Sequence, residues 1–180
     1  VTIVDQLEQL GTGHAVSVCR DAVDPAEDVL VLYGDHPLVS PATIGALADE
    51  HETSGATVTL MTYTVPDFGV YEGAFASFGR IIRNKDGQIQ AIREAKDASV
   101  EEKAIKEVNP AFYVFSGSWL WESIGKLEAK NTQKEYYLTD LVSMAIAQGE
   151  PVLTIPGTDL REAVGVNTPE QLRLAQSMMV

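Results

Sequence analysis

An apolar run that ends in a glycine, an aspartate and a proline constrains this chain more than any other stretch. Residues 29–33 are apolar throughout, which is typical of a strand buried on both faces of a parallel sheet. Gly34 lets the backbone turn, and Pro37 prevents the strand from continuing. Asp35 is therefore predicted at the carboxyl edge of the sheet, where open α/β sheets bind their ligands. Its carboxylate is a candidate ligand for a hard cation such as Mg²⁺, and capping of the following turn is the alternative.

The charge and composition of the chain argue against several classes of protein. The 180 residues carry a formal net charge of −13, whereas a nucleic-acid surface needs a basic patch. No apolar run reaches the roughly 18–20 residues that span a bilayer, so we expect no membrane partner. The single Cys19 cannot form an intramolecular disulfide, which favours a reducing cytoplasm. Because the first residue is Val1 rather than methionine, we expect an internal fragment.

Strand and helix signals alternate along the chain, which predicts an α/β protein. Ser40-Pro41 is typical of an N-cap followed by proline at the first helical position, and the helix is predicted to run to about Thr53. The apolar residues 56–63 are predicted as the next strand, which would complete a βαβ unit. Asp86-Gly87 lies between two alternating runs and predicts a hairpin.

Together these signals predict one domain over residues 1–180. We expect a Rossmann-like sheet, mixed but mostly parallel, with flanking helices. Residues 2–5 are predicted as a further short strand. Residues 66–77 are predicted as a loop or lid over the site, and an ordinary surface insertion is the alternative.

Three further loops place polar groups where a ligand would bind. Gly11-Thr12-Gly13 precedes a helix and permits close backbone approach to a ligand, although a tight loop capped by its threonine is the alternative. Asn109 precedes a proline, so it is extended and can present its amide to a ligand or form a turn. Asn167 lies on the loop that enters the last helix at Thr168-Pro169. Its amide oxygen can join a metal ion held by Asp35.

Seven short motifs in one order carry a resemblance to a known family. They are Gln9-Leu10-Gly11-Thr12-Gly13-His14-Ala15, Tyr33-Gly34-Asp35-His36-Pro37-Leu38, Phe78-Gly79-Arg80-Ile81, Ile92-Arg93-Glu94-Ala95-Lys96-Asp97-Ala98, Glu107-Val108-Asn109, Glu135-Tyr136-Tyr137-Leu138-Thr139-Asp140 and Gly165-Val166-Asn167. The chain resembles the uridyltransferase domain of the bacterial bifunctional N-acetylglucosamine-1-phosphate uridyltransferase/glucosamine-1-phosphate acetyltransferases. The motifs span nearly the whole chain, and their common order makes the resemblance specific.

The resemblance implies a fold and a reaction. The fold would be that of the nucleotide-diphospho-sugar transferases, with the first βαβ portion missing. The reaction would be Mg²⁺-dependent transfer of a uridylyl group from UTP to N-acetylglucosamine 1-phosphate, which gives UDP-N-acetylglucosamine, a peptidoglycan precursor, and pyrophosphate. Association of copies into a homo-oligomer is compatible with this assignment.

The resemblance also implies roles for individual residues. Two residues would act in catalysis by holding Mg²⁺, and the rest would bind the substrates. Asp35 and Asn167 would hold the metal. The substrate-binding residues would be Gln6, Gln9, Gly11 and Thr12 for uracil, Tyr33 and Gly34 near the sugar nucleotide, and Gly79, Glu94, Asn109 and Thr139 around the amino sugar.

The glycine-rich Gly-Thr-Arg-Met-type loop that cradles the triphosphate in the family has no counterpart in this sequence. We therefore expect this chain alone to turn over UTP poorly. Two alternatives follow: a related sugar-phosphate nucleotidyltransferase, and a non-catalytic module that binds nucleotide sugars.

Overall fold

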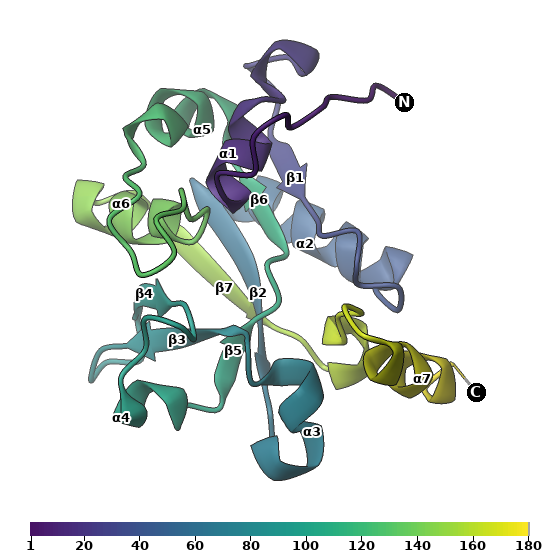
Figure 1. The fold of residues 1–180 in the computed structure, drawn as a ribbon. Helices are drawn as coiled ribbons and strands as arrows, with labels where there is room; N and C mark the ends of the chain where they lie inside the picture. The colour runs from purple at the N-terminus through teal and green to yellow at the C-terminus, as the bar shows by residue number, and fades with distance from the viewer. Residues whose placement is uncertain (180) are drawn as a thin grey trace.

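The computed structural model describes residues 1–179, with the side chains of residues 70–73 excepted. Seven strands form one mixed sheet, and helices flank it (Figure 1). The strands are β1 (Val29–Val31), β2 (Val58–Thr64), β3 (Gly79–Arg83), β4 (Ile89–Arg93), β5 (Glu107–Asn109), β6 (Tyr113–Phe115) and β7 (Val152–Pro156). The α-helices are α1 (Thr12–Ser17), α2 (Pro41–Ser54), α3 (Phe68–Phe75), α4 (Val100–Lys103), α5 (Gly117–Ser123), α6 (Asp140–Gln148) and α7 (Pro169–Ser177). Short 3-10 turns are η1 (Arg20–Ala22), η2 (Ile124–Lys126) and η3 (Leu160–Ala163).

The central strand β2 organises the sheet, whose order is β1-β6-β2-β5-β3-β4, with β7 also paired to β2. The α/β class and the flanking helices are confirmed, but the expected mostly parallel pairing is wrong. Only β2 and β7 pair in parallel among the described strands; the other neighbours are antiparallel. The β1-α2-β2 unit exists, yet β6 lies between its two strands and runs against both of them.

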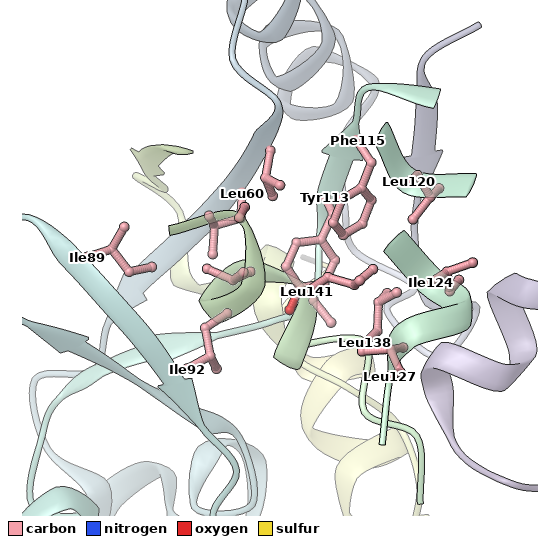
Figure 2. Packing of buried hydrophobic residues seen from close by; sticks show 14 of the residues in the cluster. Leu60, Ile89, Ile92, Tyr113, Phe115, Leu120, Ile124, Leu127, Leu138 and Leu141 are labelled. Carbon is pink, nitrogen blue, oxygen red and sulfur yellow. The ribbon is translucent and has the colours of Figure 1, made fainter. Parts of the chain in front are cut away.

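Burial on both faces of the sheet explains that error. Alternate residues of β2 enter two different hydrophobic clusters, with Val58 and Leu60 in one and Met61 and Tyr63 in the other. Figure 2 shows the first cluster, in which Leu60 and Tyr113 of neighbouring strands meet residues from α5 and α6. A strand covered on both faces is apolar throughout whatever its direction, so an apolar run does not reveal whether its neighbours are parallel.

Local signals set the ends of several elements correctly. The Ser40 hydroxyl accepts a hydrogen bond from the Thr43 amide at 3.1 Å, which caps α2 as predicted. Thr168 caps α7 in the same way, within a capping box. The hairpin of β3 and β4 turns at Gly87, which has a φ of 80°. No helix of residues 1–179 is long and apolar enough to cross a bilayer.

Two local predictions are wrong. Residues 2–5 form no strand, because they find no partner on the sheet and remain exposed. Residues 66–77 are not an open loop, since most of them form α3. Phe68 and Phe75 of α3 pack with the second cluster, and the Arg80 guanidinium stacks 4.6 Å from the Phe68 ring centroid. This tertiary packing stabilises α3 although its sequence shows no clear helical periodicity.

A two-residue bulge interrupts the strand that follows α4. Four steps along β2, from Thr64 to Leu60, correspond to six steps along the partner, from Glu107 to Tyr113. The two extra residues separate β5 from β6 beside the central strand β2. Within the bulge Ala111 has a φ of 67°, the left-handed region that favours glycine. The bulge pushes this backbone toward the cavity described next.

Candidate functional site

Asp35 and Asn167 are brought together at the edge of the sheet. The Asn167 side-chain nitrogen donates to Asp35 Oδ2 at 3.1 Å, although 132 residues separate them in the chain. The backbone N–H of Val166 donates to the Asp35 carbonyl at 2.8 Å, so main chain and side chain tie the two segments. Both side chains reach solvent, and that of Asp35 is 33% exposed. The pair therefore lies where a ligand could reach it.

The donor chemistry of this pair fits a hard divalent cation. A carboxylate and an amide oxygen are the kinds of ligand that Mg²⁺ takes, and the ion usually completes its shell with phosphate oxygens and water. No group of three or more His, Cys, Asp or Glu residues is placed to hold a metal within the described chain. A metal here would therefore depend on Asp35 and Asn167 together with its substrate.

A cavity of about 460 Å³ opens beside this pair. It combines acidic, amide, hydroxyl and aromatic groups from segments spread over the whole chain. Its lining residues are Thr12, Tyr33, Asp35, His36, Ser77, Phe78, Gly79, Glu94, Ala95, Lys96, Asn109, Pro110, Ala111, Gln133, Glu135, Tyr137, Thr139 and Asn167. A volume of several hundred Å³ with convergent polar groups is typical of a small-molecule site.

Glu94 is a partly buried carboxylate in the lining of the cavity. The Thr139 hydroxyl donates to Glu94 Oε1 at 2.9 Å. Burial raises the pKa of the Glu94 carboxyl, and this hydrogen bond opposes the shift. Burial also raises the pKa of Tyr33 to about 12, so its phenol stays protonated and can act as a donor. The wall can thus accept hydrogen bonds from ligand hydroxyls at one point and donate one at another.

The bulge supplies a third part of the wall. Asn109 is buried, and its amide is engaged inside the bulge. Asn109 Nδ2 donates to the Tyr113 hydroxyl at 2.5 Å, and Asn109 Oδ1 accepts from the Ala111 N–H at 3.1 Å. The side chain fixes the turn that exposes Pro110 and Ala111 to the cavity. Its predicted contact with an amino sugar stays a prediction.

Other predicted substrate-binding residues lie outside the lining of this cavity: Gln6, Gln9, Gly11 and Gly34. Gln6 Nε2 instead donates to the Gly11 carbonyl at 3.2 Å. The segment after Gly11 lies against residues 136–138, where the Leu138 N–H donates to the Thr12 hydroxyl at 3.0 Å. Their predicted roles toward uracil or the sugar nucleotide stay predictions.

The cavity also contains residues outside the predicted set of metal-binding and substrate-binding residues. His36 is buried and packs against the rings of Phe112 and Phe78, with centroids 5.0 and 5.9 Å away. Burial lowers the pKa of His36, which the Asp35 carboxylate opposes. Lys96 and Gln133 also line the cavity. His36, Phe78 and Lys96 lie inside the motifs quoted above, whereas Gln133 carried no sequence signal.

A family of known proteins matches most of this chain. The family profile described as "MobA-like NTP transferase domain" matches residues 1–137, well over half of the chain. The chain belongs to the MobA-like NTP transferase family. The matched range contains Asp35, Glu94 and Asn109, and Asn167 lies beyond it. As an NTP transferase domain, the chain is a nucleotidyltransferase by family.

Curated relatives of this NTP transferase domain cover almost all of it. The "Bifunctional protein GlmU" of Fervidobacterium nodosum is 46% identical over 171 residues, 95% of this chain and 34% of that protein. The protein of the same name from Trichlorobacter lovleyi is 43% identical over 99% of this chain and 38% of its own length. The one from Desulfotalea psychrophila is 38% identical over 97% of this chain and 50% of its length. The chain therefore spans about a third to a half of these relatives, and the resemblance found in its motifs is confirmed.

Proposed function

We propose that this NTP transferase domain transfers a uridylyl group from UTP to N-acetylglucosamine 1-phosphate, with Mg²⁺ between Asp35 and Asn167. The observation that carries the proposal is the 3.1 Å contact between these two side chains beside a cavity that the partly buried Glu94 carboxylate lines. The similarity to bifunctional GlmU proteins over nearly the whole chain supports the choice of substrates.

The proposed reaction joins two anions. A phosphate oxygen of the sugar 1-phosphate attacks the α-phosphorus of UTP, and a new P–O bond forms. The bond between the α-phosphorus and the bridging oxygen breaks, and pyrophosphate leaves with that electron pair. Because the nucleophile is already ionised, no residue has to act as a strong base. The barrier lies in charge repulsion and alignment, so positioning and local positive charge supply most of the catalysis.

The residues of the cavity suit these tasks. Asp35 and Asn167 would hold Mg²⁺, which when bound would neutralise phosphate charge. Lys96 lies on the rim of the same cavity and can add a further positive charge. Glu94 can accept hydrogen bonds from sugar hydroxyls, and Thr139 orients it. Gly79 lies where the wall has no room for a side chain, because a Cβ there would lie 2.8 Å from the Ile92 side chain and 3.6 Å from Glu94.

Calorimetry of UDP-N-acetylglucosamine binding tests the proposal. Binding to the 180-residue chain is measured with MgCl₂ and with EDTA, because we expect poor turnover of UTP by this chain. Asp35→Asn should remove most of the Mg²⁺-dependent gain in affinity, on the order of tenfold or more. Asp86→Asn, in the exposed hairpin turn, is the control. Equal Mg²⁺ dependence in the two variants would remove Asp35 from the site.

Transfer to a different sugar phosphate is the second candidate, and one observation favours it. The Asn109 amide is already hydrogen-bonded at both ends inside the bulge, so it offers less to an N-acetyl group. Titration with UDP-glucose beside UDP-N-acetylglucosamine decides between the candidates. Tighter binding of the N-acetylated ligand supports the first proposal, and equal affinities support the second.

A further inference from the structure

The two chain segments that carry Asp35 and Asn167 are tied together a second time, through a buried carboxylate. Glu162 lies on η3, five residues before Asn167, and is only 9% exposed. The Thr43 hydroxyl donates to Glu162 Oε2 at 2.5 Å, across 119 residues of sequence. The Tyr63 hydroxyl donates to the same oxygen at 3.3 Å. One carboxylate oxygen therefore joins three separate elements.

Thr43 belongs to the segment that begins at Asp35. It lies in the first turn of α2, and its backbone N–H and hydroxyl both contact the N-cap Ser40. Only a short connection separates this cap from Asp35. The hydrogen bond between Thr43 and Glu162 therefore fixes the C-terminal end of the segment 35–43. The candidate metal ligand Asp35 is the first residue of that segment.

Tyr63 supplies an anchor that cannot easily move. Its side chain is 2% exposed on the central strand β2. A Cβ added to Gly157 would lie 2.2 Å from the Tyr63 ring, so the chain between β7 and η3 passes directly over that ring. The Gly157 N–H also donates to the Thr62 carbonyl at 2.8 Å. The phenol thus holds Glu162 to a buried residue of the central strand.

We propose that Glu162 is a positioning residue for the metal site and acts through Thr43 and Tyr63. The Thr43–Glu162 hydrogen bond joins the segments 35–43 and 162–167 at the ends that lie away from the metal ligands. The hydrogen bond from the Val166 N–H to the Asp35 carbonyl joins them at the ends that carry the ligands. Together they close a small ring of chain that sets the separation of Asp35 and Asn167. The part of the inference that concerns metal binding rests on the proposed function. The structural link between Glu162 and the 164–167 segment does not depend on that function.

A matched pair of threonine variants tests the tie. Thr43→Val removes one donor to Glu162 and keeps side-chain volume. Thr57→Val is the control, because the buried Thr57 hydroxyl donates to Glu150 at 2.7 Å at the opposite end of β2. Thr43→Ser keeps the hydroxyl and should rescue the defect. Tyr63→Phe is a second variant that removes the other donor, in case Thr43→Val fails to fold.

Hydrogen exchange of the ligand-free chain is the first readout. The Val166 amide should exchange about tenfold faster in Thr43→Val than in Thr57→Val, because its bond to Asp35 opens more often. Equal exchange in both variants, or no rescue by Thr43→Ser, would overturn the proposal.

Mn²⁺ binding in the presence of UDP-N-acetylglucosamine, followed by electron paramagnetic resonance, is the second readout. Thr43→Val and Tyr63→Phe should weaken Mn²⁺ binding about tenfold, and Thr57→Val should leave it unchanged. If the unsubstituted chain binds no Mn²⁺ in this assay, the metal site of the proposed function fails. If it binds Mn²⁺ and all variants bind it equally, only the role of Glu162 fails.

Discussion

Ala111 occupies a backbone conformation that alanine adopts at a cost, and its replacement by glycine measures that cost. Its φ of 67° lies in the left-handed region, and Lys134 is the other non-glycine residue with positive φ in the described chain. The residue is 7% exposed and sits in the bulge that lines the cavity. Ala111→Gly therefore relieves strain at the wall of the candidate site. Ala98→Gly is the matched control, since Ala98 is 9% exposed and has no positive φ.

The expected effect is a difference between two substitutions of the same kind. Glycine gains about 0.5–1 kcal/mol of conformational freedom in the unfolded chain, and the lost methyl burial costs about 0.8 kcal/mol. Ala98→Gly should therefore lower the free energy of unfolding by roughly 1.5 kcal/mol. At Ala111 the left-handed conformation costs alanine about 1–2 kcal/mol, and glycine removes that cost. Ala111→Gly should leave the stability nearly unchanged.

Urea unfolding of both variants provides the measurement, provided that the slope with denaturant stays constant. The expected result is that the free energy of unfolding of Ala98→Gly lies about 1–2 kcal/mol below that of Ala111→Gly. Equal losses at the two positions would show that the bulge stores no strain, and the reasoning about its shape would be refuted. A larger loss at Ala111 would mean that its methyl group is needed to hold the wall.

Two further predictions concern the Glu94 carboxylate and two glycines outside the cavity lining. Burial raises the folded-state pKa of Glu94, so its stabilising contribution is complete below the unfolded-state pKa and is lost as the pH rises through the folded-state value. Glu94→Gln should therefore melt higher than the unsubstituted chain at pH 7, and this advantage should disappear toward pH 4; a difference independent of pH would contradict the assignment. Gly11→Ala should lower the free energy of unfolding by about 2 kcal/mol or more, because φ is 113° and the new Cβ would lie 2.7 Å from the Tyr136 carbonyl. Gly45→Ala, with open space around it inside α2, should instead gain about 0.5–1 kcal/mol, and thermal unfolding of both variants checks the contrast.

Much of the local structure could be predicted because its causes lie within a few residues. Ser40 and Thr168 cap their helices through hydrogen bonds to amides three residues on, and the prolines that follow are already in helical conformation. Gly87 allows the hairpin turn through its positive φ. Each of these signals depends on bonds that close short stretches of chain, so the neighbouring residues suffice.

The site could be predicted in part for a different reason. Asp35 directly follows the turn-forming Gly34, and Asn167 directly precedes the helix N-cap Thr168. Their motifs also match a family, which links positions that local patterns cannot connect. The same resemblance assigns Gln6, Gln9 and Gly11 to a ligand, and these roles stay predictions. The structure hydrogen-bonds residues 10–13 to residues 136–138.

The sequence by itself determined where several helices and strands begin, which side chains carry charge, and which family the chain resembles. Only the tertiary structure decided that β6 lies between β1 and β2, that a bulge turns Ala111 toward the cavity, and that Glu162 joins Thr43 to Tyr63. These features depend on pairings between segments far apart in the chain. Such pairings are chosen by the burial and hydrogen bonding of the whole core, and no short stretch contains that information.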